Sequence, residues 1–416
     1  TIVALASGSG PAGVAVIRIS GPAARNVVMQ LAGQLPEARV AKLRLLQSGS
    51  GDKIDKALVL WFPAPHSFTG EDVAEFQVHG GRAVVSDFIE ACLALPDVML
   101  AKPGEFTRRA FENGKMDLSA AEGLGDLIDA ETSAQRRQAF RQMEGALASH
   151  ILAWRNDIID ALADAEGDID FPDEDLPTGL SIRARSRIMK LRDTLQRHLT
   201  EAERAVRVRD GFRVAIVGAP NAGKSSLLNA LAQRDAAIVS PTPGTTRDVV
   251  EVRLILSGMV IWLADTAGLR DAADTIEAQG IRKALMHAEN ADLRIGVITD
   301  NAEREPLRKL ISPNDLWILA KADIQHWPSA STGELVLSSK TGAGVELLET
   351  IIAERAQQDG ATSELAPLTR LRHKESVTAT ISALDRALTA NGDAVELIAE
   401  DLRLAARHLG QIIGRV

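Results

Sequence analysis

Hydrophobic and polar residues alternate along three short stretches near the start of the chain, a pattern that predicts half-buried β-strands. These stretches are VAVIRIS (14–20), KALVLWF (56–62) and DVAEFQVH (72–79). The next stretch, RAVVSDFIEACLAL (82–95), has apolar residues at helical spacing. The first part of the chain is therefore expected to be an α+β domain.

Helical spacing then dominates residues 117–205, which contain no proline outside the acidic stretch DFPDEDLPTG (170–179). That acidic stretch is expected to connect two long helices. Near residue 210 the pattern changes to alternating strands and helices, which continue to about residue 357. A polar linker (357–369) and a final helical stretch follow.

We therefore expect a multidomain protein that combines α/β and all-α parts, with an α/β domain of mostly parallel sheet inserted into a helical domain. Such an insertion is physically easy, because the termini of many α/β domains lie close together. The expected boundaries are 1–116 for the N-terminal α+β domain, 117–209 and 358–416 for the two parts of the helical domain, and 210–357 for the inserted domain.

The composition is that of an ordinary soluble protein, with 45% hydrophobic and 25% charged residues. No apolar run is long enough to cross a bilayer and no basic signal-peptide flank precedes the first strand, so we expect no membrane contact. The single cysteine, Cys92, cannot form an internal disulfide. This favours a cytoplasmic protein in a reducing environment.

The formal net charge of −9 does not indicate nucleic-acid binding. Arginine is nevertheless concentrated in two helical segments, 136–142 and 183–199. For each segment alone, a solvated helix face is the simpler interpretation.

The stretch GSGPAG (8–13) matches the glycine pattern of dinucleotide-binding proteins. That pattern needs a helix after the glycines, because the helix N-terminus faces the pyrophosphate. Here the β-branched VAVIRIS follows instead. A strand is predicted after these glycines, and a dinucleotide site is not expected.

A second glycine-rich stretch, RVAIVGAPNAGKSSLLNAL (213–231), has the context that the first one lacks. An apolar strand runs into Gly218-x-x-x-x-Gly223-Lys224-Ser225, and a helix is predicted to follow. In such a loop, backbone N–H groups surround the phosphates of a nucleotide. Lys224 would reach the terminal phosphates, and Ser225 would offer its hydroxyl to Mg²⁺.

Two further motifs follow in the order that a nucleotide hydrolase requires. PGTTRD places Thr245 and Thr246 on a loop that can close over the γ-phosphate and its metal. VIWLADTAGLR ends a predicted strand at Asp265, which can hold Mg²⁺ through water, and Gly268 offers an N–H to the γ-phosphate. The inserted domain is therefore expected to be a Ras-like P-loop GTPase domain.

Guanine recognition is expected from the stretch ILAKAD (318–323). Lys321 can lie along the base, and Asp323 can accept the N1–H and N2–H donors that adenine lacks. Ala320 stands where guanine-binding proteins have Asn, and the lost hydrogen bonds should cost about 1–3 kcal/mol of affinity. The later LSSKTGAG (337–344) fits a backbone loop that packs against the base. We therefore expect guanine.

The group that orients the attacking water remains open at this point. Leu269 stands where signalling GTPases have glutamine, and a leucine side chain cannot orient water. Arg247 is a candidate arginine finger, and Asn221 could either hold a monovalent cation in its place or serve only as a turn former. The acidic candidates for orienting the water are Asp271, Asp274 and Glu277.

The stretches PNAGKSSLLNAL, GTTRD and DTAGLR resemble the potassium-activated GTPases. SFTGEDV, HGG, KPGEFTRRAFENGKMDLSAAEG and DLIDAET narrow the resemblance to the MnmE (TrmE) family of tRNA-modification GTPases, over essentially the whole chain. The resemblance implies a homodimer formed through the N-terminal domain and a flavoprotein partner, MnmG. Together they would add an aminomethyl or carboxymethylaminomethyl group to carbon 5 of the wobble uridine in tRNA.

The resemblance also implies the cofactors. A tetrahydrofolate derivative, 5-formyl- or methylene-tetrahydrofolate, would supply the one-carbon unit, and K⁺-dependent pairing of the GTPase domains would drive the cycle. Ser225 and Thr246 would ligate Mg²⁺. The K⁺ ligands would be Asn221, Ser240, Thr242 and Thr245.

Among the acidic candidates, the resemblance selects Glu277 for orienting the water, with Lys224 and Thr246 as the other catalytic residues. The set expected to bind GTP is Asn221, Ala222, Gly223, Lys224, Ser225, Ser226, Thr245, Thr246, Asp265, Gly268, Lys321, Asp323, Ser338, Ser339 and Lys340.

The folate contacts implied by the resemblance are Arg18, Glu75 and Lys115. The strand pattern agrees, because Glu75, Gln77 and His79 share one face of DVAEFQVH. A carboxylate suits the two adjacent donors of a pterin edge, and Arg and Lys suit the glutamate tail of the folate.

Two features depart from the family pattern. Ala320 replaces the family's Asn, and the chain stops at GQIIGRV where the family continues to a Cys-x-Gly-Lys tail. Cys92 is no substitute for that tail, because it falls in a helical pattern where a small buried residue is expected.

Two other functions remain open from the sequence. One is a ribosome-assembly or RNA-chaperone GTPase, but nothing after residue 357 resembles the RNA-binding domain that such a protein appends. The other is a folate-dependent transferase in which the GTPase domain is only a timer.

Overall fold

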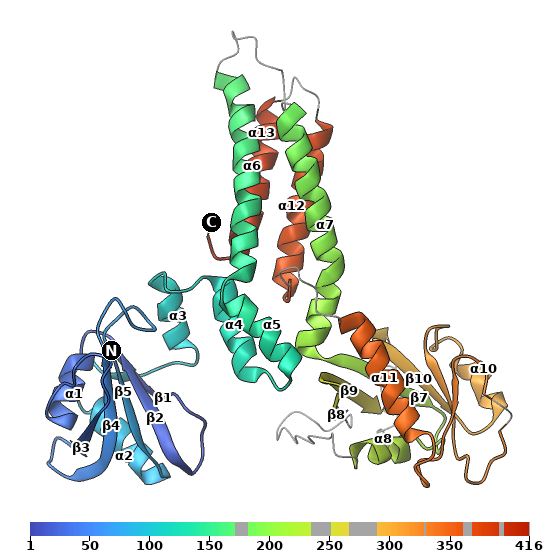
Figure 1. Cartoon of the computed structure of the whole chain (residues 1–416), viewed down its shortest axis with the longest axis horizontal. Helices are drawn as coiled ribbons and strands as arrows, with labels where there is room; N and C mark the ends of the chain where they lie inside the picture. The colour runs from blue at the N-terminus through green and yellow to red at the C-terminus, as the bar shows by residue number, and fades with distance from the viewer. Residues whose placement is uncertain are drawn as a thin grey trace, which may run out of the picture. The chain divides into compact units, whose positions relative to one another are not determined.

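The computed structural model describes residues 1–170, 182–233, 251–265, 289–327, 330–360, 368–390 and 395–415. Contacts between residues divide the chain into two compact units, Thr1–Ala121 and Glu122–Val416. The division falls inside helix α4 (Leu118–Asp129). Figure 1 shows the elements of both units along the chain.

The first unit contains a six-stranded sheet with the strand order β3-β4-β5-β2-β1-β6. Neighbouring strands are antiparallel except for β1 and β6, which are parallel. The strands are β1 (Ile2–Leu5), β2 (Ala12–Ser20), β3 (Lys42–Gln47), β4 (Lys53–Phe62), β5 (Val73–Gly80) and β6 (Met99–Leu100). Strand β2 begins at Ala12, within the last two residues of the first glycine-rich stretch, so these glycines lead into a strand, as predicted.

The helices of this unit are α1 (Ala24–Ala32), α2 (Arg82–Leu93) and α3 (Glu105–Glu112). The core lies between the sheet and helices α1 and α2. On β5, Phe76 and its neighbours on the same face are buried, whereas Glu75 and His79 on the other face are not. The predicted alternation is confirmed, and Cys92 is fully buried in α2, as expected.

Four long helices of the second unit share one hydrophobic core. They are α6 (Ala146–Asp170), α7 (Ile182–Asp210), α12 (Leu371–Thr389) and α13 (Val395–Ile412). The last two helices pack against α6 and α7 although the second sheet lies between them in the sequence (Figure 1). The shorter helix α5 (Ser133–Met143) packs beside α6 and α7.

The second sheet has the strand order β12-β11-β10-β7-β9-β8. All neighbours are parallel except β8 and β9. The strands are β7 (Phe212–Gly218), β8 (Glu251–Leu256), β9 (Met259–Asp265), β10 (Leu293–Ile298), β11 (Leu316–Leu319) and β12 (Glu334–Val336). The helices are α8 (Lys224–Ala232), η1 (Asn301–Glu303), α10 (Arg304–Leu307) and α11 (Val345–Gly360). The predicted combination of a mostly parallel sheet with an all-α part is confirmed.

The sequence predicts two connecting segments, at residues 170–179 and 357–369. Helix α11 continues to Gly360, so the first residues of the linker predicted at 357–369 are helical; glutamine suits a helix, and glycine suits its end. Helix α6 ends at Asp170. The rest of the connection predicted at 170–179 lies outside the described residues.

The junction between α7 and β7 is a single glycine, Gly211, with a φ of +92°. A Cβ at this position would lie 2.8 Å from Cδ1 of Trp262, so both the backbone angle and the space require glycine. Beside it, the guanidinium Nε of Arg207 donates to Asp292 Oδ1 at 2.7 Å. Within the described ranges no helix is both long and apolar enough to cross a membrane.

Candidate functional site

The second glycine-rich stretch forms the loop between the end of β7 and the start of α8, as predicted. Gly218 ends the strand where a Cβ would lie only 2.4 Å from the carbonyl oxygen of Val297, so a larger residue would have to move the backbone. Asn221 and Gly223 have φ angles of +63° and +100°. A left-handed loop before a helix N-terminus is suited to binding phosphate.

Lys224 is the first residue of α8 and is only 4% exposed. Its Nζ donates hydrogen bonds of 2.8 Å to the carbonyl oxygens of Gly218 and Ala219. The loop therefore holds the ammonium group where the phosphates of a bound nucleotide would lie. Ser225 and Ser226 follow in the first helical turn and are exposed.

Strand β9 brings Asp265 to the same edge of the sheet. In the parallel pairing of β7 with β9, Ile216 lies opposite Asp265, two residues before Gly218. Parallel strands that end together form a crevice outside the edge, where ligands bind in folds of this kind. The other residues predicted for hydrolysis and metal binding lie outside the described residues: Ser240, Thr242, Thr245, Thr246, Arg247, Gly268, Leu269, Asp271, Asp274 and Glu277.

The residues predicted to read guanine lie on two loops that a hydrogen bond joins. Oδ1 of Asp323, after β11, accepts a 2.8 Å hydrogen bond from the hydroxyl of Ser338, after β12. This hydrogen bond, with a smaller contribution from the charges of Lys340 and Lys321, lowers the pKa of Asp323. Asp323 is therefore an anion at neutral pH and can accept donors from a base. Ser339 lies between Ser338 and Lys340 on the second loop.

Ala320 is buried in the core of the second sheet. Its N–H donates to the carbonyl oxygen of Ile298, and its own carbonyl oxygen accepts a hydrogen bond from the indole Nε1 of Trp327, both at 2.9 Å. The next residue, Lys321, has a φ of +57°, so the chain turns sharply here. The sequence does not indicate a role for Trp327 here, because it lies outside the motif and nothing in its spacing indicates this contact.

In the first unit, the structure brings together Arg18 and Glu75, two of the residues predicted to bind folate. They lie opposite each other on β2 and β5. The Nε and Nη2 atoms of Arg18 are 2.8 Å and 2.7 Å from Oε1 of Glu75. The guanidinium also lies 5.2 Å from the ring centroid of Phe68 and 5.8 Å from that of Phe106. These cation–π contacts were not foreseen from the motifs.

The third residue, Lys115, lies beside the same loop that carries Phe68. A Cβ added to Gly70 would be 3.0 Å from Cε of Lys115. The side-chain amide of Asn113 donates a 2.8 Å hydrogen bond to the carbonyl oxygen of Thr69, which ties the segment before Lys115 to this loop. The loop therefore contacts Arg18 through Phe68 and Lys115 through Gly70.

Comparison with known proteins decides the family. The family model "GTP-binding protein TrmE N-terminus" matches residues 1–115, and the model "MnmE helical domain" matches residues 118–416. The chain belongs to the MnmE family. Relatives described as tRNA modification GTPase MnmE match over its whole length: 47% identity to that of Phenylobacterium zucineum (96% of the relative covered), 49% to that of Maricaulis maris (95%) and 50% to that of Parvibaculum lavamentivorans (96%).

A part of this MnmE-family chain also matches a solved structure, the G domain of the T. maritima FeoB iron transporter. The identity is 28%, the match covers 35% of this chain and 99% of that one, and the TM-score is 0.28. In the chain itself, β7, β9, β11 and β12 are all parallel members of one sheet. The glycine-rich loop, Asp265 and the loops after β11 and β12 therefore share one edge.

Proposed function

We propose that this chain binds and hydrolyses GTP and that the hydrolysis serves the modification of tRNA at the wobble uridine. The observation that carries the proposal is the position of the Lys224 ammonium inside the glycine-rich loop, at the sheet edge that also carries Asp323. The description of its close relatives as tRNA modification GTPases supports the second part of the proposal.

Different residues of the nucleotide site would bind the phosphates and the base. The N-terminal turn of α8 and the Lys224 ammonium would hold the phosphates, since both carry positive charge. The anionic Asp323 would accept the two adjacent N–H donors of guanine, for which adenine has no equivalent. Ser338 would keep the Asp323 carboxylate oriented, because its hydroxyl already donates a hydrogen bond to Oδ1.

The donor atoms of this site fit the metal ions that the family implies. Mg²⁺ prefers hard oxygen ligands, and Ser225 presents a hydroxyl in the first turn of α8, next to Lys224. We assign Ser225 and Thr246 to Mg²⁺, and Asn221, Ser240, Thr242 and Thr245 to K⁺. Bound K⁺ would supply positive charge near the terminal phosphates, in place of an arginine finger. Glu277 would orient the attacking water.

The N-terminal unit fits a tetrahydrofolate. The two aromatic rings beside Arg18 are suited to a flat ring system, and the neighbouring Glu75 carboxylate to the adjacent N–H groups of a pterin. Lys115 would attract the anionic tail. A bound tetrahydrofolate would supply the one-carbon unit, and Arg18, Glu75 and Lys115 would bind and orient it.

The remaining parts of the proposal concern assembly. We propose a cytoplasmic homodimer that works with the flavoprotein MnmG. We also retain the division into 1–116, 117–209 with 358–416, and 210–357 as the N-terminal, helical and GTPase domains.

The experiment that tests the proposed function is steady-state hydrolysis of GTP and of ATP by the full chain, each in K⁺ and in Na⁺ at equal ionic strength. We expect turnover of GTP that depends on K⁺ and little turnover of ATP. The matched variant Asn221→Ala should lose the stimulation by K⁺ and keep its low rate in Na⁺. Equal turnover of ATP, or turnover indifferent to the cation, would contradict the proposal.

A further inference from the structure

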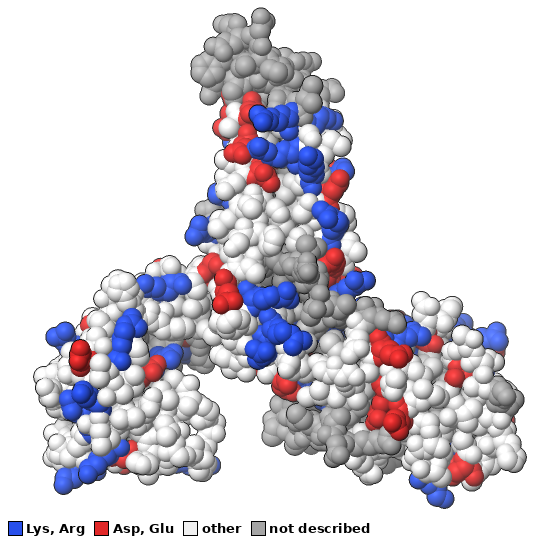
Figure 2. Space-filling model, viewed as in Figure 1, with Lys and Arg blue, Asp and Glu red and all other residues white. Residues whose placement is uncertain are grey.

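Helix α7 carries four basic residues at intervals of seven along its length: Arg183, Lys190, Arg197 and Arg204. We refer to these four residues as the cation stripe. Residues seven apart lie on nearly the same face of a helix, with a drift of about 20° per step. All four side chains are exposed. Figure 2 shows Lys and Arg side chains at intervals along the edge of the bundle where α7 runs.

The stripe differs from Arg187 and Arg192 of the same helix in its ion pairs. Arg187 Nη1 lies 2.6 Å from Asp160 Oδ2, and Arg192 contacts the carboxylates of Asp193 and Asp385 at 2.8 Å and 3.4 Å. In the described part of the chain, by contrast, none of the four stripe residues has an ion pair with a carboxylate. Among the described residues, no carboxylate therefore neutralises the charges of the stripe.

The position of the stripe follows from the packing of α7. Its buried seam includes Ala184, Leu191 and His198, each one residue after a member of the stripe. The stripe therefore runs beside the seam. Successive members are about 10.5 Å apart along the axis and the whole stripe is about 32 Å long, at 1.5 Å per residue.

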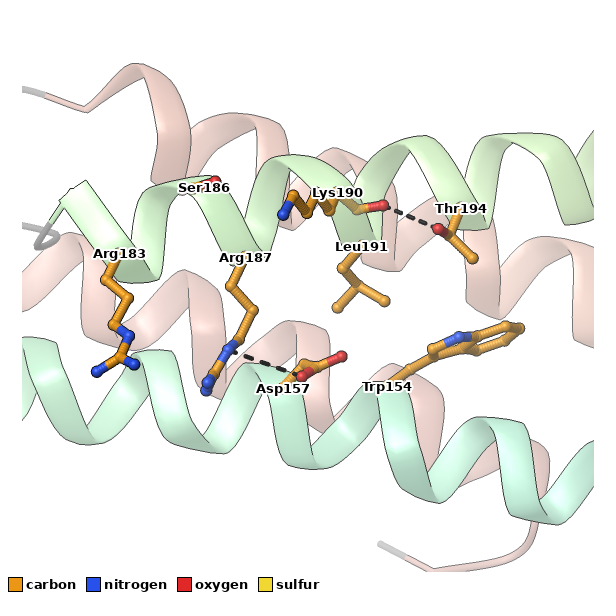
Figure 3. Close-up of a pocket in the computed structure, with 8 residues that line it drawn as sticks. All are labelled: Trp154, Asp157, Arg183, Ser186, Arg187, Lys190, Leu191 and Thr194. Atoms are coloured by element: carbon orange, nitrogen blue, oxygen red, sulfur yellow. Dashed lines mark hydrogen bonds and ion pairs between the residues drawn. The ribbon is translucent and has the colours of Figure 1, made fainter.

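A pocket with a volume of about 740 Å³ lies along the first half of the stripe, between α6 and α7. Figure 3 shows Arg183 and Arg187 reaching from α7 towards α6, with Trp154 and Leu191 at the floor. Arg187 is 3.8 Å from Asp157 across this pocket, whereas Arg183 forms no ion pair with any residue that the structure describes. The pocket therefore offers a concave, basic surface beside the exposed cations.

We infer that the cation stripe is a docking surface for the phosphate backbone of RNA. This inference rests on the proposed function, because it names the face of the helical part that would receive the tRNA. Isolated, regularly spaced cations fit a polyanion, and contacts to phosphate make up the larger share of protein–nucleic acid hydrogen bonds.

An acidic protein surface is the competing occupant of this face. Protein interfaces have an apolar or aromatic centre. Between members of the stripe, at spacings of three and four residues, this face carries only polar residues: Ser186, Arg187, Asp193, Thr194, Thr200 and Glu201. Trp154 and Leu191 in the pocket are only 6% and 4% exposed, so the face has no exposed apolar or aromatic centre. The net charge of −9 does not oppose RNA binding here, because charges more than about 8–10 Å away are screened at physiological salt.

The test is binding of a fluorescently labelled, unmodified tRNA transcript to the full chain, measured by anisotropy between 50 and 200 mM KCl. The variant combines Arg183→Gln, Lys190→Gln, Arg197→Gln and Arg204→Gln. At 100 mM salt we expect its affinity to fall on the order of tenfold or more. The slope of log affinity against log salt should become shallower by about 3, since each neutralised phosphate contributes about 0.7–0.9.

A matched control removes the same charge elsewhere in the second unit, by Arg308→Gln, Lys309→Gln, Arg386→Gln and Arg403→Gln. These side chains are exposed, and the three arginines are paired with carboxylates. The control should keep the slope of the unmodified chain. Thermal unfolding and GTP turnover should be the same for the unmodified chain and for both variants.

Three results would overturn the inference: an unchanged slope in the stripe variant, an equal loss in the control, or unchanged RNA binding with loss of binding to the purified flavoprotein partner. The last result would assign the stripe to a protein instead. If the chain lacked GTPase activity but still bound tRNA through the stripe, the proposed function would be wrong and this inference would stand. The two failures can therefore be told apart.

Discussion

The indole Nε1 of Trp327 donates a 2.9 Å hydrogen bond to the carbonyl oxygen of Ala320. This bond holds the start of the loop that carries Lys321 and Asp323, in a chain that lacks the usual Asn at position 320. A side chain from further along the sequence therefore fixes the turn.

Trp327→Phe keeps most of the ring but removes the donor. We expect guanine-nucleotide affinity to fall by about 3–10-fold, which corresponds to loss of one hydrogen bond. Titration with a fluorescent GDP analogue measures this. Affinity for pyrophosphate, which would contact only the glycine-rich loop, should not change. An equal loss for both ligands would mean that Trp327 supports the whole sheet and not this loop.

Ala320→Asn restores the amide that the family pattern contains. We expect GDP to bind about 5–150-fold more tightly, because regained hydrogen bonds are worth about 1–3 kcal/mol. The same titration measures the effect. Ala320 is buried in the sheet core. Weaker binding of GDP would therefore show that the core has no room for the larger side chain and leaves the amide of the new Asn without hydrogen-bond partners.

Glu277→Ala should leave nucleotide affinity within about twofold but slow GTP hydrolysis by about 10² or more, as is typical of a lost positioned group. Single-turnover hydrolysis and GDP titration separate the two effects. Asp271→Ala and Asp274→Ala are the matched controls and should retain hydrolysis. If the Glu277→Ala variant still modified tRNA at the normal rate, the GTPase domain would be only a timer.

The carboxylate of Glu122 contacts two residues of α12: Oε1 accepts from Arg372 Nε at 2.7 Å, and Oε2 lies 3.0 Å from Nε2 of His373. Burial alone would raise the pKa of Glu122, but the hydrogen bonds from His373 and Arg372 outweigh it and lower the pKa to about 2. Burial also lowers the pKa of His373, against the opposing effect of Glu122.

These two pKa shifts make the stability of the fold depend on pH. A depressed carboxyl pKa adds stability above the unfolded value near 4.5, and this stability is lost as the pH falls towards 2. The buried His373 acts in the same sense below its ordinary pKa of 6.5, because folding favours its neutral form.

Glu122→Gln should therefore lower the free energy of unfolding at pH 7 by about 2 kcal/mol, allowing for the partial exposure of the carboxylate. The difference from the unmodified chain should shrink below pH 4.5. Urea unfolding followed by circular dichroism measures both. Glu112→Gln, which breaks the exposed pair with Arg108, is the control and should change stability little at any pH. A difference that stayed constant down to pH 3 would contradict the assignment.

Two glycines of α4 form a matched pair. A Cβ at Gly123 would lie 2.6 Å from the backbone N of Met143, whereas a Cβ at Gly125 would have nothing within 4 Å. Gly123→Ala should lower the free energy of unfolding by about 1–3 kcal/mol through overpacking against α5. Gly125→Ala should raise it by about 0.5–1 kcal/mol through helix propensity. Equal effects in urea unfolding would show that α4 can move away from α5.

The glycine-rich loop could be predicted from the sequence because phosphate binding constrains neighbouring residues at fixed spacing, and Gly218, Gly223 and Lys224 carry that constraint themselves. Strand faces could be predicted for a similar reason, since burial alternates along β5. The contacts of Trp327 with Ala320 and of Phe68 with Arg18 could not. These contacts depend on how separate loops pack in the folded chain, and local sequence patterns do not predict that packing.

The helical core has a consequence for synthesis on the ribosome. Helices α6 and α7 leave the ribosome long before α12 and α13, which complete their core. At about 5–20 residues per second, the delay is on the order of ten seconds or more. During that time the nascent helices expose residues such as Ile151, Ile158 and Leu195, which are fully buried in the finished protein. The second sheet can fold during this interval, while the half-built bundle exposes apolar surface through which nascent chains can aggregate.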